Sequence, residues 1–217
     1  MSQCQCQGIE SLFDQRLAAT QLERMQRRGP LKTTRLLIEA LRQRGVHGRT
    51  LLDIGGGVGA VQHQLLASGL REATDVDASS AYLRAAKSES TRLGFEGRVH
   101  YHYGNFVDLA PGIPPADIVT LDRVICCFDD MAGLVGASAE KAHIMYGLVY
   151  PRDAWWARLV VRLMNLTHRI RGNQFRVFTH RTAEVEALLE RKGLVRGFHG
   201  VAGAWQVSVF DRKVIPA

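Results

Sequence analysis

One stretch decides the fold of this chain: Leu51-Leu52-Asp53-Ile54-Gly55-Gly56-Gly57-Val58-Gly59-Ala60. Its apolar start predicts a buried strand, and its glycines predict a tight turn that opens a helix. Glycine suits such a turn because it adopts backbone angles that other residues avoid and lets a ligand touch the main chain. Asp77 ends the next apolar stretch, twenty residues after Gly57. A carboxylate at that offset can accept hydrogen bonds from a ribose diol, so we predict a nucleoside-bearing cofactor on the first two strands of an α/β sheet.

Two patterns for that cofactor overlap in the glycine-rich turn. Gly55-x-Gly57-x-x-Ala60 fits a dinucleotide fingerprint, whereas Gly55-x-Gly57-x-Gly59 is preceded by Asp53 at the end of the strand. A pyrophosphate gains nothing from a carboxylate there, but the ammonium group of a methionine moiety does. The second pattern resembles motif I of the class I S-adenosylmethionine-dependent methyltransferases.

Three further stretches resemble motifs of the same family, and the resemblance covers about residues 30 to 212. Val76-Asp77-Ala78-Ser79 resembles the second motif, in which the acid holds the ribose. Gly104-Asn105-Phe106 resembles the third, with Asn105 where the family usually has the Asp that pairs with adenine. Strand 116–122 resembles the fourth and ends beside the sulfonium at Asp122. The cofactor-binding residues that the resemblance implies are Asp53, Gly55, Gly56, Gly57, Gly59, Asp77, Ala78, Asn105, Phe106 and Asp122.

Hydrophobic periodicity predicts helices over 8–28 and 32–44, followed by alternating strands and helices. Such alternation means parallel strands in a doubly wound sheet. Only a short link separates the last two strands, so we expect them to form an antiparallel hairpin. The predicted fold is α/β and Rossmann-like, with seven strands, of which six are parallel and the last is antiparallel. The expected elements are strands 50–54, 72–77, 98–103, 116–122, 143–149, 194–201 and 204–211, and helices 59–68, 79–93, 130–142 and 182–192.

Composition indicates one globular domain over residues 1–217, with N-terminal helices in 1–45 and an inserted cap at 151–179. The chain is 46% hydrophobic and carries no apolar run near ~18 residues, and we expect no signal peptide from its polar start. A cytoplasmic enzyme is the expectation. The net charge of +7 could attract nucleic acid, an acidic lipid surface or an anionic substrate. We expect no nucleic-acid partner, because no cluster of Arg or Lys interleaves with aromatic residues.

The inserted segment contains a strongly amphipathic helix. At roughly 100° per residue from Trp155, apolar side chains up to Ile170 fall on one arc, and Arg158, Arg162, Asn165, His168 and Arg169 fall on the opposite arc. We interpret it as a cap whose apolar side faces the domain and covers the substrate pocket. A second interpretation is an interfacial helix, in which 153–171 contacts a membrane surface. A dimer contact is the third, and the oligomeric state stays open.

Candidates for chemistry follow the fourth and fifth strands and lie near the insertion. Residues 122–128, 150–152 and 175–180 resemble stretches of magnesium-protoporphyrin O-methyltransferases, although Cys126 stands where that group tends to carry His. The predicted catalytic residues are Cys126, His180 and Arg152. Arg152 could pair with a substrate carboxylate, and His180 could act as a base or cap the helix after it. The cysteine pairs, Cys4-x-Cys6 and Cys126-Cys127, lack zinc-site spacing, so we predict no metal site.

The predicted function is methyl transfer from S-adenosylmethionine to a small-molecule acceptor, with oxygen the expected accepting atom and S-adenosylhomocysteine the product. The residues leave three other classes open. These are a non-catalytic S-adenosylmethionine-binding or interaction protein, a nucleic-acid methyltransferase and a nicotinamide-dependent reductase.

Overall fold

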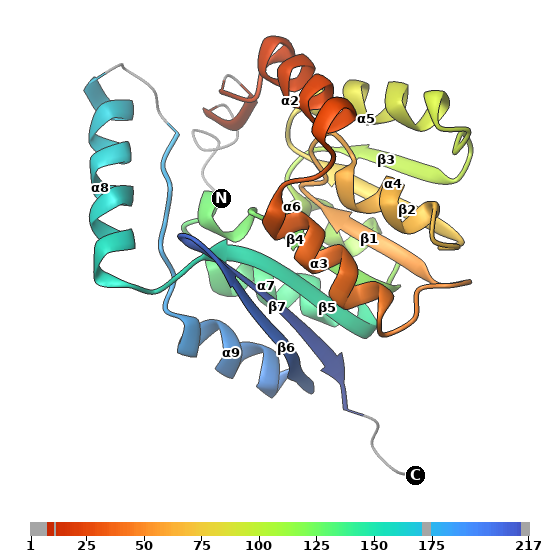
Figure 1. The fold of residues 1–217 in the computed structure, drawn as a ribbon. Coiled ribbons are helices and arrows are strands. Elements are labelled where there is room, and N and C mark those ends of the chain that lie inside the picture. Colours follow the sequence, from red (N-terminus) through yellow and green to blue (C-terminus); the bar gives the residue numbers. More distant parts are fainter. Residues whose placement is uncertain (1–7, 11, 171–174, 214–217) are drawn as a thin grey trace.

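A computed structural model describes residues 8–10, 12–170 and 175–213, and its core is a seven-stranded sheet (Figure 1). The strand order is β3-β2-β1-β4-β5-β7-β6. β7 runs antiparallel to both of its neighbours, and β1 to β6 run in one direction. The predicted doubly wound sheet with a closing hairpin is therefore confirmed. The strands are β1 (Thr50–Ile54), β2 (Glu72–Asp77), β3 (Val99–Tyr103), β4 (Ala116–Asp122), β5 (Ala142–Pro151), β6 (Leu194–Ala202) and β7 (Trp205–Arg212).

Helices cover both faces of this sheet. One face packs against α3 and α4, and the other packs against α6, α7 and α9. β1 is mainly apolar because its side chains are buried on both faces of the sheet. Leu51 packs on the first face, while Leu52 and Ile54 pack on the second. The helical segments are α2 (Gln15–Arg28), α3 (Lys32–Arg42), α4 (Ala60–Leu66), α5 (Ser80–Arg92), α6 (Phe106–Leu109), η1 (Ala110–Gly112), η2 (Ile125–Cys127), α7 (Met131–Glu140), α8 (Trp155–Ile170) and α9 (Thr182–Arg191).

The prediction of one helix over 8–28 is wrong. Helical residues 8–10 and 12 are separated from α2 by a break at Phe13 and Asp14. Asp14 has extended backbone angles, and its carboxylate accepts a hydrogen bond from the backbone N–H of Leu17 at 2.8 Å. An N-cap of this kind starts a new helix, so the continuous apolar spacing hides a turn. The break turns the chain back, and Phe13 packs on Tyr82 of α5.

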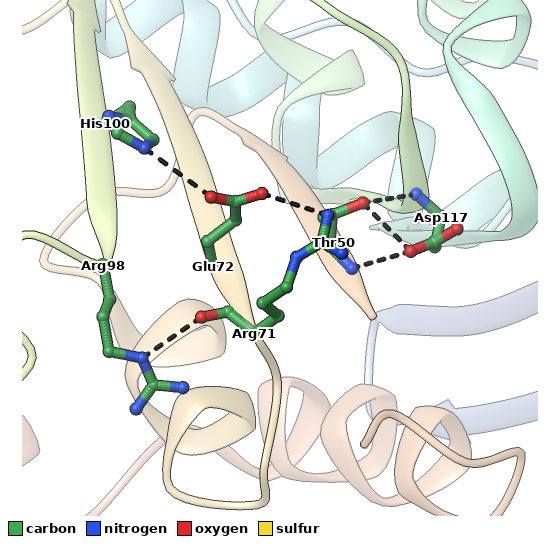
Figure 2. Close-up of polar contacts among 6 residues, drawn as sticks. All are labelled: Thr50, Arg71, Glu72, Arg98, His100 and Asp117. Atoms are coloured by element: carbon green, nitrogen blue, oxygen red, sulfur yellow. Dashed lines mark hydrogen bonds and ion pairs between the residues drawn. The ribbon is translucent and has the colours of Figure 1, made fainter. Parts of the chain in front are cut away.

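The two edges of the parallel sheet differ in chemistry. At the edge where strands begin, polar side chains pair across the strands (Figure 2). Thr50 of β1 and Asp117 of β4 exchange hydrogen bonds of 2.8 and 2.9 Å, and Glu72 of β2 lies 3.9 Å from His100 of β3 and pairs with the preceding Arg71 at 3.2 Å. At the edge where the strands end, carboxylates gather with fewer partners. This second edge is where ligands bind in open α/β sheets.

No helix among residues 8–10, 12–170 and 175–213 is both long and apolar enough to cross a membrane.

Candidate active site

A cavity of about 420 Å³ opens at the carboxyl ends of β1, β2 and β4. The glycine-rich turn after β1 and the start of α5 form one half of its wall. The other half is formed by η2, by α8 and by Trp205 at the start of β7. All ten predicted cofactor residues except Gly59 line this cavity.

The glycine-rich turn has the geometry that the sequence predicted. Gly55, Gly57 and Gly59 all have positive φ angles, of 66°, 59° and 80°. Gly56 needs its lack of a side chain for a different reason, since a Cβ there would lie 2.6 Å from the buried Asp75 carboxylate. The turn therefore keeps its backbone close to the cavity, and larger residues would displace it.

Asp77 joins the turn to the start of α5. One carboxylate oxygen accepts from the backbone N–H of Gly57 at 3.0 Å, and the other accepts from that of Ser79 at 2.8 Å. Burial raises the pKa of Asp77 to about 6, and these two hydrogen bonds oppose the rise. Each oxygen can accept a further hydrogen bond. The carboxylate is thus fixed at the cavity wall with capacity for two hydroxyl groups.

Asp53 is buried at the end of β1. One of its oxygens accepts from the Thr120 hydroxyl at 2.7 Å, while the other has no partner among the described residues. Burial, reinforced by the charges of Asp122 and Asp77, raises the pKa of Asp53 to about 7. Buried carboxylate oxygens are seldom unpaired. This oxygen fits a cationic hydrogen-bond donor supplied by a ligand, as the ammonium group of a methionine moiety would be.

Asn105 and Asp122 line the cavity with their side chains already engaged. Asn105 accepts from the backbone of Val107 at 3.2 Å and donates to Asp108 at 2.8 Å, so it caps α6. Asp122 accepts from the Thr34 hydroxyl at 2.5 Å and from Arg123 at 3.1 Å. Their contacts with the cofactor stay predictions.

The three predicted catalytic residues do not converge. Cys126 lines the cavity, and its thiol donates to the carbonyl oxygen of Arg123 at 3.3 Å. His180 donates through Nε2 to the carbonyl oxygen of Ile125 at 2.8 Å and does not line the cavity. Arg152 is also absent from the lining, and its backbone N–H bonds to Ala204.

Cys126 and Cys127 lie on η2 and line the cavity. Hydrogen bonding to Cys126 and burial raise the pKa of Cys127 well above its ordinary value, so its thiol stays protonated. Cys4 and Cys6 lie outside the described residues. Within the part of the chain that the structure describes, no three His, Cys, Asp or Glu side chains are grouped to hold a metal ion.

Sequence reasoning missed Arg123, which has φ of 63° and is the one non-glycine residue among those described with a positive φ. Its guanidinium contacts Asp122 and lies 5.9 Å from the Trp205 ring. It is also the one cationic side chain among the described residues that line the cavity. Such backbone angles are costly outside glycine and concentrate at functional sites. No sequence pattern predicts the positive φ of Arg123, since the residues that follow it are ordinary apolar ones.

Sequence reasoning also missed Tyr82, whose hydroxyl is buried at the cavity without a hydrogen-bond partner among the described residues. Its ring packs edge-on against Phe13 with centroids 5.6 Å apart. Tyr82 falls in the helix expected over 79–93, and the helical pattern does not distinguish a core tyrosine from one that faces a ligand.

Comparison with known proteins decides what this site belongs to. The family model for the O-methyltransferase domain matches residues 8–135, more than half of the chain. The chain belongs to the O-methyltransferase domain family. A search of curated proteins found no match.

Solved structures support the fold of this O-methyltransferase. The magnesium protoporphyrin IX methyltransferase of Synechocystis with bound SAH superposes with a TM-score of 0.68, at 15% identity over 84% of this chain and 82% of that one. An O-methyltransferase family protein of Burkholderia thailandensis gives 0.71, at 20% identity over 94% and 62%. A family 2 O-methyltransferase of Planctomyces limnophilus in complex with apigenin gives 0.62, at 16% identity over 88% and 64%.

The family and the fold together identify an S-adenosylmethionine-dependent methyltransferase. Its cofactor is S-adenosylmethionine, and the unpartnered oxygen of Asp53 and the fixed carboxylate of Asp77 fit the ammonium group and the ribose of that molecule. The predicted membership of the class I methyltransferases is confirmed.

Proposed function

We propose that this enzyme methylates an oxygen atom of a small, largely apolar acceptor. The observation that carries the proposal is the second half of the cavity, where apolar side chains surround one guanidinium. Phe128, Val160, Met164 and Val177 line that half together with Arg123. A pocket with apolar walls and few polar groups is typical of small-molecule sites. The family description and the apigenin complex of a similar structure support the same acceptor class.

The side chains of this half favour an acceptor oxygen that is acidic or already ionised. Bound S-adenosylmethionine supplies an electrophilic methyl group on a sulfonium. No histidine or lysine is present among the described residues of the lining, and the carboxylate at the end of β4, Asp122, already accepts hydrogen bonds from Thr34 and Arg123, so we assign no general base there. Arg123 would hold an oxyanion by a charge-assisted hydrogen bond and lower the pKa of a hydroxyl beside it. The apolar wall would exclude water from the reacting oxygen.

Cys126 and Trp205 also line the acceptor half of the cavity. Cys126 is buried at the cavity, and its thiol already donates to a backbone carbonyl, so we assign it to the acceptor wall. Trp205 packs near Arg123 and would stack on a planar acceptor. His180 fixes the carbonyl of Ile125 and would act on the acceptor only through η2.

Two measurements test the proposal in sequence. Calorimetric titration of S-adenosylhomocysteine into the wild type and Asp77→Ala should show binding that the variant loses. Glu96→Ala, which removes an exposed carboxylate, is the matched control and should bind as the wild type does. Transfer of a labelled methyl group is then measured with phenols, aromatic carboxylic acids, amines and RNA. Labelling of RNA or of amines, with phenols and acids unlabelled, would contradict an oxygen acceptor.

A further inference from the structure

α8 turns its apolar face away from the rest of the molecule, opposite to the orientation that the cap interpretation predicted. Trp155 and Ile170 are 77% and 76% exposed, and Leu159, Leu163 and Leu166 between them are each at least half exposed. Figure 1 shows α8 standing to one side of the sheet. We call these five residues the outward apolar face.

The contacts of α8 explain this orientation. The helix packs inward through Ala157, the one buried residue of α8. About two turns further along, the Asn165 amide exchanges hydrogen bonds of 2.7 and 2.8 Å with the backbone of Val177. His168 then packs edge-on against Phe175. The domain therefore holds α8 by its small and polar side, and these contacts leave the outward apolar face uncovered by the described residues.

The charged side chains of α8 are all positive. Trp155–Ile170 contains three arginines and no acidic residue. On the helix, Arg158, Arg162 and Arg169 lie along one border of the outward apolar face at ~100° per residue. The nearby acid Asp153 pairs with Arg158 at 3.1 Å, so two arginines of this border have no acidic partner among the described residues.

We propose that the outward apolar face and its arginine border dock this enzyme on an anionic lipid bilayer. An exposed helix with tryptophan and leucine on one side and arginine along the edge is built to lie in the membrane interface. Anionic headgroups complement the arginine border, whereas a second copy of α8 would bring like charges together. α8 has 16 residues and is about 24 Å long, so it lies in the interface and does not span it.

The border of the outward apolar face that lies away from the arginines adjoins the active-site cavity. Val160 and Met164 are partly exposed on α8 and also line the cavity. Docking would therefore place an apolar path between the bilayer and the site. An acceptor dissolved in the membrane could enter without crossing water, which extends the proposed function without depending on it.

The test uses the full chain and two kinds of vesicle, phosphatidylcholine alone and phosphatidylcholine with an equal part of phosphatidylglycerol. We expect co-sedimentation with the anionic vesicles and a blue shift of tryptophan emission that Trp155→Phe reduces. Leu159→Ser/Leu163→Ser should lower the partition coefficient about 100-fold, since each half-exposed leucine contributes about tenfold. Arg162→Gln/Arg169→Gln should lower it about 25-fold on anionic vesicles only.

A matched control and the oligomeric state make the result decisive. Val195→Ser/Val201→Ser removes two exposed apolar residues from β6, and it should sediment as the wild type does. Equal binding of wild type and the leucine variant, or no binding to either vesicle, would overturn the proposal. A concentration-dependent dimer in ultracentrifugation that the leucine variant loses, without vesicle binding, would instead assign the face to a second copy. Binding of S-adenosylhomocysteine should be unchanged in every variant, which confirms that each one is folded.

Discussion

Replacing Asp53 with asparagine should stabilise the cofactor-free enzyme near pH 8 and weaken its hold on the cofactor. Burial is the main reason that the pKa of Asp53 rises from 3.8 to about 7. At about 1.4 kcal/mol for each unit of pKa, ionising this carboxyl in the folded protein costs roughly 4 kcal/mol relative to the unfolded chain. Asparagine keeps an oxygen for the Thr120 hydroxyl and leaves a buried NH2 group unpaired, which costs about 1–3 kcal/mol. The net stabilisation is about 1–3 kcal/mol.

The sign of the effect depends on pH. The folded protein keeps the Asp53 proton up to about pH 7, whereas the unfolded chain loses it near pH 3.8. The wild-type free energy of unfolding therefore falls as pH rises through that window. The Asp53→Asn variant lacks this part of the fall, so its advantage over the wild type should grow by about 2–3 kcal/mol between roughly pH 5 and pH 8.

Urea unfolding at both pH values, with the m-value checked to be unchanged, measures the difference. Asp129→Asn removes an exposed carboxylate and controls for net charge. Calorimetry of the same proteins should show that Asp53→Asn loses affinity for S-adenosylhomocysteine, since a neutral amide pairs poorly with an ammonium group. A stability difference between Asp53→Asn and the wild type that is the same at both pH values would refute the reasoning, because it would mean that Asp53 ionises alike in the folded and unfolded chain.

Three further predictions follow from the cavity. Affinity for S-adenosylhomocysteine should rise with pH through about 6, where the pKa of Asp77 lies, because only the ionised carboxyl accepts hydrogen bonds at both oxygens; calorimetry across this range should find that Asp77→Asn flattens the slope. Gly56→Ala should abolish cofactor binding, since its Cβ would lie 2.6 Å from Asp75, whereas Gly112→Ala has no neighbour within 4 Å and should bind normally in the same titration. Arg123→Leu should raise the acceptor KM about 10- to 100-fold with cofactor affinity unchanged; equal losses of both would place the guanidinium on the cofactor instead.

The order of elements and the cofactor half of the site could be predicted because short segments determine them. Asp53, the glycines and Asp77 follow strand ends, and the carboxyl ends of neighbouring parallel strands meet at one edge. The spacing of these residues along the chain therefore determines that they lie close together in the fold. The antiparallel hairpin was predictable for the same reason, since the link between β6 and β7 is too short for a crossover.

The acceptor half could not be predicted, because it depends on packing between distant segments. Arg123 lines the cavity and has a backbone angle that its own sequence does not signal. Periodicity found the apolar arc of α8 and assigned it to the domain, whereas Ala157, Asn165 and His168 face the domain and the arginines border the apolar arc. What settles the orientation is the pairing of Asn165 with Val177, twelve residues further along the chain and beyond the end of the helix. An interpretation based on hydrophobic pattern assumes that the apolar side of a helix packs on the domain. That assumption fails for α8, because polar contacts such as the Asn165–Val177 pair hold its other side against the domain.

The two edges of the sheet show how stability and function are divided in this enzyme. At the edge where strands begin, Thr50 and Asp117 pair between β1 and β4, and Glu72 pairs with Arg71, so these polar groups are satisfied in the protein alone (Figure 2). At the opposite edge, Asp53 and Asp77 are buried with raised pKa values, and one oxygen of Asp53 has no partner among the described residues. Ionised carboxylates so close together destabilise the empty site, and a cofactor that brings an ammonium group relieves them. Thermal stabilisation by S-adenosylmethionine should therefore be larger near pH 8 than near pH 5, and a stabilisation independent of pH would count against this account.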